Sequence, residues 1–93
     1  MPERATAIVT ILNKLGLHAR PAMCFVEEVA STSSSVSVRR VDSEEVVDGS
    51  SIMQLMMLAA TQGTKLEITA EGADADEAIA RLARLIESKF DEE

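Results

Sequence analysis

Aromatic side chains are almost absent from this chain of 93 residues, which has Phe25 and Phe90 but no tryptophan or tyrosine. Its core must therefore be aliphatic, and a platform of aromatic rings for stacking nucleic-acid bases is not available. Basic residues are also few, nine against sixteen acidic ones, so the formal net charge is -7. Proteins that bind nucleic acid need a basic surface, so this balance argues against that class.

The chain has one cysteine and one histidine. One cysteine cannot form an intramolecular disulfide, and the two residues together cannot build a structural zinc site, so we expect no metal. No apolar run reaches the ~20 residues that a membrane span needs, and residues 1–4 lack the apolar core of a signal peptide. We expect one compact, acidic domain over residues 1–93 that is cytoplasmic and does not insert into a membrane.

Four segments have the period-2 alternation of half-buried strands. They are residues 6–12, 36–41, 45–47 and 65–70. In the first of them, Ala7, Val9 and Ile11 form the more apolar face. The serine-rich residues 31–35 are typical of a loop.

Three other segments have apolar residues at helical spacing. They are residues 21–30, residues 52–58 and a last segment that follows Asp74 and extends its apolar stripe to Phe90. Pro21 favours a helix start at that position, because a proline in the first turn loses no intrahelical hydrogen bond.

Two of these helices begin with the sequence of a capping box, in which two side chains satisfy each other's exposed amides. Ser51 and Gln54 form one such pair, and Asp74 and Glu77 form the other. The order βαββαβα, with one polar strand face, predicts an α+β open-faced two-layer sandwich. We expect a four-stranded antiparallel sheet with three helices on one face.

The only histidine, His18, lies just before the predicted helix start. Amides at a helix start have no intrahelical partner and attract an anion, and Arg20 adds a cation that binds phosphate well. Imidazole is an available nucleophile near neutral pH. The arrangement indicates a phosphoryl acceptor. The alternative is a surface or hydrogen-bonded histidine without a chemical role, and no acid or base partner points to hydrolysis.

Three motifs resemble the HPr family, the histidine-containing phosphocarriers of the bacterial phosphotransferase system. NKLGLHARPAM resembles the segment around the active-site histidine, VDGSSIMQLMMLAATQGT that around a regulatory serine, and TAEGADADEAIARL the last strand and helix. They occur in family order and cover the chain from about Arg4 to Phe90. NKLG and the terminal FDEE also resemble the nitrogen-related NPr branch.

The resemblance implies that His18 carries a phosphoryl group on Nδ1, received from phosphorylated Enzyme I and passed to an Enzyme IIA-type domain. It implies that Arg20 stabilises the phosphate, while the backbone at Pro21 and Ala22 completes a phosphate cradle. The chain is then a phosphoryl-carrying protein substrate and not an enzyme. It is expected to act as a monomer without a cofactor, since the partner supplies the activated phosphate.

Ser51 resembles the serine that an ATP-dependent HPr kinase/phosphorylase modifies in some bacteria, a role compatible with helix capping. Many relatives have lysine before this serine, whereas this chain has Ser50, so modification of Ser50 stays open. One alternative function is a regulator switched at Ser51 that binds a transcription factor or enzyme. Another is a small-molecule-binding α+β domain.

The predicted helix 52–58 carries three methionines beside three other large apolar residues. They cannot all face inward, so at least one or two methionines should remain exposed and form a deformable apolar patch. The resemblance implies a docking surface around His18 that consists of Ala19, Met23, Met53 and Met56.

Overall fold

The computed structural model describes residues 3–91. The ends of the predicted domain, residues 1–2 and 92–93, lie outside the described residues, and so does the end of the FDEE motif. The strands are β1 (Glu3–Thr10), β2 (Ser35–Arg40), β3 (Val46–Asp48) and β4 (Lys65–Gly72). The helices are α1 (Ala19–Ala30), α2 (Ile52–Met57) and α3 (Ala75–Glu87), with a short 3-10 turn at Lys89–Asp91.

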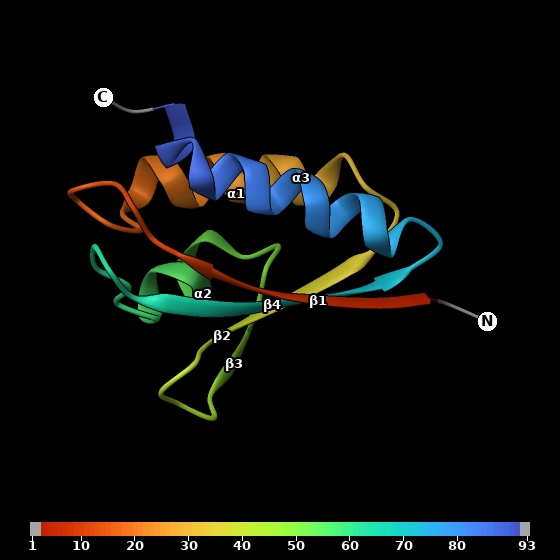
Figure 1. Cartoon of the computed structure of the whole chain (residues 1–93), viewed down its shortest axis with the longest axis horizontal. Coiled ribbons are helices and arrows are strands. Elements are labelled where there is room, and N and C mark those ends of the chain that lie inside the picture. The colour runs from red at the N-terminus through yellow and green to blue at the C-terminus, as the bar shows by residue number, and fades with distance from the viewer. Residues whose placement is uncertain (1–2, 92–93) are drawn as a thin grey trace.

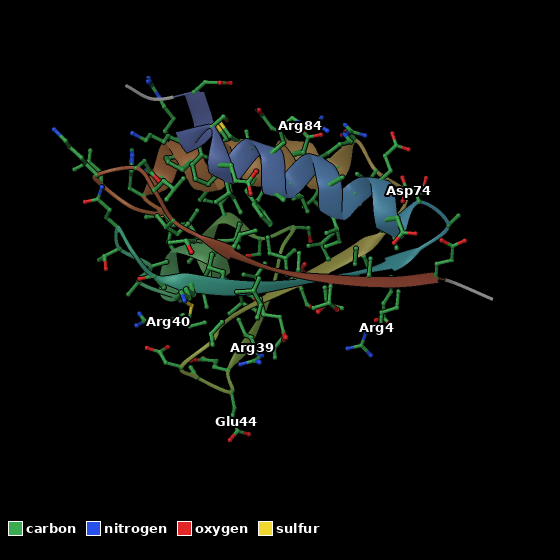
Figure 2. All side chains as sticks on the ribbon, viewed as in Figure 1. Arg4, Arg39, Arg40, Glu44, Asp74 and Arg84 are labelled. Atoms are coloured by element: carbon green, nitrogen blue, oxygen red, sulfur yellow. The ribbon has the colours of Figure 1, made fainter. Side chains whose placement is uncertain are left out.

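The strands form one antiparallel sheet in the order β1-β4-β2-β3, and α1 and α3 lie side by side on one of its faces (Figure 1). Val9, Val38 and Ile68 point into the core between the layers and are buried. Arg4 and Arg39 project from the opposite face (Figure 2). The alternation of the sequence therefore assigned the two sheet faces correctly, and the predicted α+β open-faced sandwich is confirmed.

The short helix α2 lies at one end of the sheet, below α1 and α3 in the view of Figure 1. Leu55 and Leu58 are buried in the same core cluster as Phe25 of α1, and α2 contacts both α1 and β3. Ile52 is partly buried against the same cluster, whereas Met53, Met56 and Met57 are exposed. The end of the sheet at α2 is also the end at which β1 leads into the loop before α1 (Figure 1).

The predicted first strand, residues 6–12, was placed too late in the sequence. β1 ends at Thr10, and the backbone then turns away. Ile11 still exchanges two hydrogen bonds with the chain before β4: its amide donates to Thr64 at 2.9 Å, and its carbonyl accepts from Gly63 at 2.8 Å. Ile11 is fully buried although it lies beyond the end of β1. The alternation of apolar residues in the sequence therefore extends past the strand itself.

The capping box predicted at Asp74 and Glu77 is wrong. Asp74 occupies the N-cap position of α3, but its side chain makes no capping hydrogen bond. Its carboxylate instead accepts from the backbone amide of Ser33 at 2.9 Å and from the hydroxyl of Ser34 at 2.5 Å. The carboxylate oxygens of Asp74 therefore bind the serine-rich loop after α1 instead of capping α3.

Phe90 is buried as predicted, but it does not continue the apolar stripe of α3. The helix ends at Glu87, and Lys89, Phe90 and Asp91 adopt φ values of 57°, 55° and 59°. This left-handed turn redirects the chain after α3 and places the Phe90 ring in the core.

Candidate functional site

His18 is the N-cap residue of α1, with extended backbone angles of φ -84° and ψ -169°. Its amide donates to the carbonyl of Gly16 at 3.0 Å, and its carbonyl accepts from the amide of Ala22 at 3.0 Å. The side chain is half-buried and makes no capping bond to the helix. His18 therefore stands at the opening of the helix without using its ring to cap it.

The helix begins at Ala19, two residues before the predicted start at Pro21. Proline is tolerated at any first-turn position, because none of those amides has a partner within the helix. Pro21 lacks an amide hydrogen, and the amide of Ala22 is already bonded to His18. Pro21 and Ala22 are also buried. The first-turn amides that the helix leaves for an anion are therefore those of Ala19 and Arg20.

The turn before His18 is fixed by Asn13 and Gly16, two residues that were not among the predicted site residues. Asn13 is fully buried and donates from Nδ2 to the carbonyl of Gly16 at 2.7 Å. Gly16 has φ +69°, and a Cβ at this position would lie 2.3 Å from the carbonyl oxygen of Ala60. The sequence did contain a signal, since asparagine followed three residues later by glycine is typical of a β-turn.

Arg20 lies two residues after His18, in the first turn of α1. Its side chain is exposed, and no carboxylate within residues 3–91 forms an ion pair with it. Ala19 is exposed beside it. An exposed guanidinium and two helix-start amides close to an imidazole form a site suited to an anion such as a phosphoryl group.

Exposed methionines lie on the two helices that meet at this end of the molecule, as expected from the sequence. The exposed fractions are 49% for Met23, 78% for Met53, 44% for Met56 and 68% for Met57. α1 and α2 contact each other, and the amide of Leu17 donates to Ala60, just beyond α2, at 2.8 Å. The structure thus joins the loop that carries His18 to the segment that follows the methionine-rich helix.

Ser51 caps α2, as predicted. Its hydroxyl oxygen accepts from the amide of Gln54 at 3.2 Å. The reciprocal half of the predicted capping box is wrong, because Gln54 Oε1 accepts from the amide of Asp48 at 2.9 Å instead. In a capping box the amide of Ser51 would donate to the side chain of Gln54, but here it donates to the carbonyl of Asp48 at 3.2 Å.

Ser50 is exposed and is bound to the same aspartate. Its hydroxyl and its amide donate to Asp48 Oδ1 at 2.7 and 2.9 Å. The hydroxyl hydrogen bond and then the amide bond hold the pKa of Asp48 below its ordinary value of 3.8. An ionised carboxylate is therefore bound to Ser50, the residue before Ser51, at neutral pH.

Neither a metal centre nor a transmembrane helix is present between residues 3 and 91. In that range no three His, Cys, Asp or Glu side chains come together as metal ligands, and no helix is long and apolar enough to cross a membrane. Cys24 is half-buried within α1 and has no disulfide partner.

The sequence model of a family described as "PTS HPr component phosphorylation site" matches residues 5–88. The phosphocarrier protein HPr of Pseudomonas aeruginosa is 50% identical over 84 residues, which cover 90% of this chain and 92% of that protein. The phosphocarrier protein NPr of Escherichia coli is 38% identical over 85 residues, which cover 91% and 93%. The crystal structure of HPr-C-His from Thermoanaerobacter tengcongensis has a TM-score of 0.88 at 44% identity and covers 96% of this chain and 98% of that one.

These similarities extend over nearly the whole chain and agree with the fold and with the motif around His18. The chain belongs to the HPr family, the phosphocarrier proteins of the phosphotransferase system, which carry a phosphoryl group and are not catalysts.

Proposed function

We propose that His18 accepts a phosphoryl group from phosphorylated Enzyme I and passes it to an Enzyme IIA-type domain. Family membership supports a phosphocarrier role. The observation that carries the assignment to His18 is its position as N-cap of α1 with a ring that does not cap the helix. The helix-start amides of Ala19 and Arg20 follow immediately and meet the requirement for an anion site.

The transfer needs little chemistry from this chain beyond a nucleophile and fixed positive charge. The lone pair of His18 Nδ1 forms the new bond to phosphorus while the bond between phosphorus and the donor breaks in line, and Nε2 keeps its proton. Negative charge is spread over the three phosphoryl oxygens during this step. The amides of Ala19 and Arg20, the positive end of the α1 dipole and the Arg20 guanidinium stabilise that charge.

In this proposal, residues 1–93 act as one phosphocarrier domain, as a monomer in the cytoplasm. The partner supplies the activated phosphate, so the chain needs no nucleotide or metal. Partner proteins dock on the apolar surface beside the site. That surface consists of Ala19, Met23, Met53 and Met56, all of which are exposed.

The test is incubation with Enzyme I and phosphoenolpyruvate labelled with radioactive phosphate. Wild-type protein and Ser51→Ala are expected to take up an acid-labile label, whereas His18→Ala takes up none. Addition of an Enzyme IIA domain is expected to remove the label from the wild type. Uptake by His18→Ala at the wild-type level refutes the assignment.

Regulation at Ser51 is a second candidate function. Ser51 is half-buried and lies two residues before Met53, the first exposed methionine of α2. A phosphate on it would place nearly two negative charges beside an apolar docking surface and impede its partners. Incubation with ATP and an HPr kinase/phosphorylase is expected to give an acid-stable label that Ser51→Ala loses and Ser50→Ala keeps. A label lost in Ser50→Ala alone reassigns the modification.

A further inference from the structure

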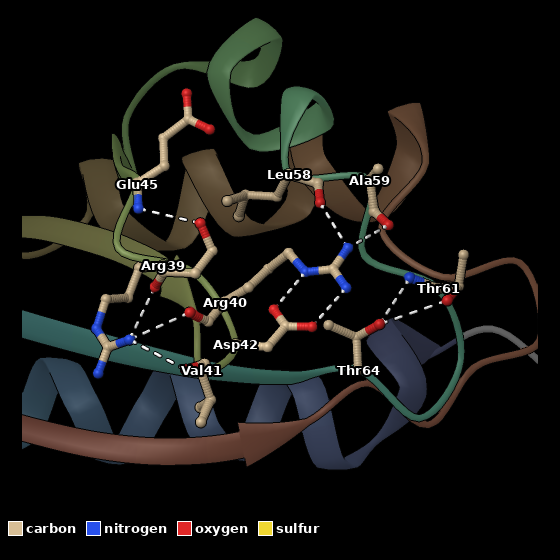
Figure 3. Close-up of polar contacts among 10 residues, drawn as sticks. Arg39, Arg40, Val41, Asp42, Glu45, Leu58, Ala59, Thr61 and Thr64 are labelled. Carbon is tan, nitrogen blue, oxygen red and sulfur yellow. Dashed lines mark hydrogen bonds and ion pairs between the residues drawn. The ribbon is translucent and has the colours of Figure 1, made fainter.

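Arg40, the last residue of β2, binds both Asp42 and the chain that leaves α2. Its Nε and Nη2 donate to the two carboxylate oxygens of Asp42 at 2.9 and 3.0 Å. Its Nη1 donates to the carbonyl oxygens of Leu58 and Ala59, both at 3.2 Å. Figure 3 shows these four hydrogen bonds from one guanidinium. We refer to Arg40 and Asp42 as the arginine clamp.

The segment that the clamp holds adopts a conformation that its sequence does not favour. α2 ends at Met57, Leu58 is the C-cap residue, and Ala59 has φ +53°. Helices commonly end in this left-handed region with a glycine, because a Cβ there is disfavoured. Here the position is alanine. The carbonyls of Leu58 and Ala59 lie beyond the last turn of α2, and the clamp gives both of them a hydrogen-bond donor.

Asp42 keeps the guanidinium in place. The hydrogen bond from Arg40 is the main reason that the pKa of Asp42 lies below its ordinary value of 3.8, so the carboxylate is ionised at neutral pH. Two parallel hydrogen bonds to a carboxylate fix the plane of an arginine side chain. This leaves Nη1 directed at the two carbonyls after α2 (Figure 3).

The residue after this segment, Ala60, contacts the turn that precedes His18. Its carbonyl oxygen accepts from the amide of Leu17 at 2.8 Å. Gly16 packs so closely against the same oxygen that a Cβ would lie 2.3 Å from it. The amide of His18 in turn donates to Gly16 at 3.0 Å. Ala60 is therefore linked through Leu17 and Gly16 to the backbone of His18.

We propose that Arg40 is a positioning residue for phosphoryl transfer, which acts through Ala59 and Ala60 on the backbone that presents His18. Loss of the clamp releases the left-handed Ala59 and loosens the Leu17–Ala60 hydrogen bond. The imidazole and the helix-start amides then no longer keep a fixed mutual geometry, on which stabilisation of the transferring phosphoryl group depends. This inference rests on the proposed function of His18.

The arginine clamp lies at the surface, so substitution of Arg40 or Asp42 does not disrupt the packing of the core. The side chains of Arg40 and Asp42 are 31% and 68% exposed. The neighbouring Arg39 offers a matched control on the same strand. It pairs with Glu67 at 2.8 Å, and its Nη1 donates to the carbonyl oxygens of Arg40, Val41 and Ser43. None of these hydrogen bonds reaches the segment after α2.

The test compares Arg40→Met with Arg39→Met. Arg40→Met is expected to slow transfer to His18 at saturating Enzyme I by about three- to tenfold, the usual range for coupling through a packed network. Amide hydrogen exchange at Leu17 is expected to accelerate about tenfold, as local opening allows, while exchange at Ile68 in the central strand stays unchanged. Arg39→Met is expected to match the wild type in both measurements.

A second variant separates positioning from a general loss of stability. Ala59→Gly removes the conformational penalty, so the double variant Arg40→Met/Ala59→Gly is expected to regain transfer and Leu17 protection. Wild-type transfer and Leu17 exchange in Arg40→Met overturn the inference, as does a double variant that is no better than Arg40→Met. Amide exchange at Leu17 is measured without a phosphate donor, so it tests the positioning role of Arg40 independently of phosphoryl transfer. Labelling of His18→Ala would refute the proposed function instead.

Discussion

Leu17 and Ala60 are joined by a backbone hydrogen bond of 2.8 Å, although they are far apart in the sequence. This bond ties the residue before His18 to the segment that follows α2. Gly16 packs against the same carbonyl, and the buried Asn13 closes the turn from the other side. Hydrogen bonds and close packing at Gly16 and Leu17 thus fix the backbone directly before His18.

Substitution of Gly16 is expected to impair both stability and transfer. In Gly16→Ala the new Cβ meets the carbonyl oxygen of Ala60 at 2.3 Å and Thr61 Cα at 2.9 Å, with φ at +69°. We expect a loss of roughly 1–3 kcal/mol in the free energy of unfolding, as for other residues held in a left-handed conformation. Urea unfolding and the rate of labelling from Enzyme I measure the two effects.

Gly63→Ala is the matched control, because Gly63 also has a positive φ of +91° but no neighbouring atom within 4 Å of the added Cβ. It is expected to lose stability without slower labelling. Equally slow labelling of both variants would show that the contact between residue 16 and Ala60 is not the cause of slower labelling in Gly16→Ala.

Removal of the Ser51 cap is expected to lower stability and leave the histidine chemistry intact. Ser51→Ala deletes the acceptor for the amide of Gln54, and loss of such a cap costs about 1 kcal/mol. Ser50→Ala removes an exposed hydroxyl that bonds only to Asp48 Oδ1 among the contacts described, so a change within about 0.5 kcal/mol is expected. Urea unfolding distinguishes the two variants, and a larger effect at Ser50 would contradict the assigned cap.

The bonds of Asp74 to the serine loop predict a loss of stability in acid. The hydroxyl of Ser34, followed by the amide of Ser33, holds the pKa of Asp74 below its ordinary value of 3.8. The folded state therefore favours the ionised form. Its contribution is complete above the unfolded pKa and is lost as the pH falls from about 3.8 through the lowered folded value.

The free energy of unfolding of Asp74→Asn is accordingly expected to differ most from the wild type at neutral pH, and the two should converge in acid. Glu44→Gln, at the exposed tip of the β2–β3 connection (Figure 2), is expected to parallel the wild type at all pH values. A constant difference between wild type and Asp74→Asn down to pH 2 would rule out this linkage.

Exposed methionines at the site end are expected to affect partner binding more than folding. Met53→Gln is expected to change the free energy of unfolding by less than about 0.5 kcal/mol. The Enzyme I concentration that gives half-maximal labelling is expected to rise about three- to tenfold, because an apolar anchor is lost from the interface. Ile8→Gln is the control, because Ile8 is exposed on the face of the sheet that the helices do not cover. An equal rise in the half-maximal Enzyme I concentration for Ile8→Gln would contradict docking at Met53.

Features that depend on local alternation were predicted well from the sequence. The order of elements and the choice of sheet face follow from which side chains are apolar, as with Val9, Val38 and Ile68. The exposed methionines of residues 52–58 were also predicted, because one short helix cannot bury so many large apolar side chains. The cap at Ser51 is local too, and it is present in the structure.

Features that depend on distant partners were not predicted. Asp74 binds Ser33 and Ser34, which lie about forty positions earlier, rather than its own helix. The start of α1 was misplaced because proline is compatible with each of the first helical positions. The arginine clamp joins Arg40 to carbonyls after α2, and nothing in the local sequence around Arg40 indicates that contact.

The most direct test of the account is nuclear magnetic resonance of the protein labelled with nitrogen-15 on histidine, after phosphorylation by Enzyme I and phosphoenolpyruvate. We predict a coupling between phosphorus and Nδ1 of His18 that disappears when the Enzyme IIA domain is added. A phosphoryl group on Nε2, or on any residue other than His18, would contradict the account.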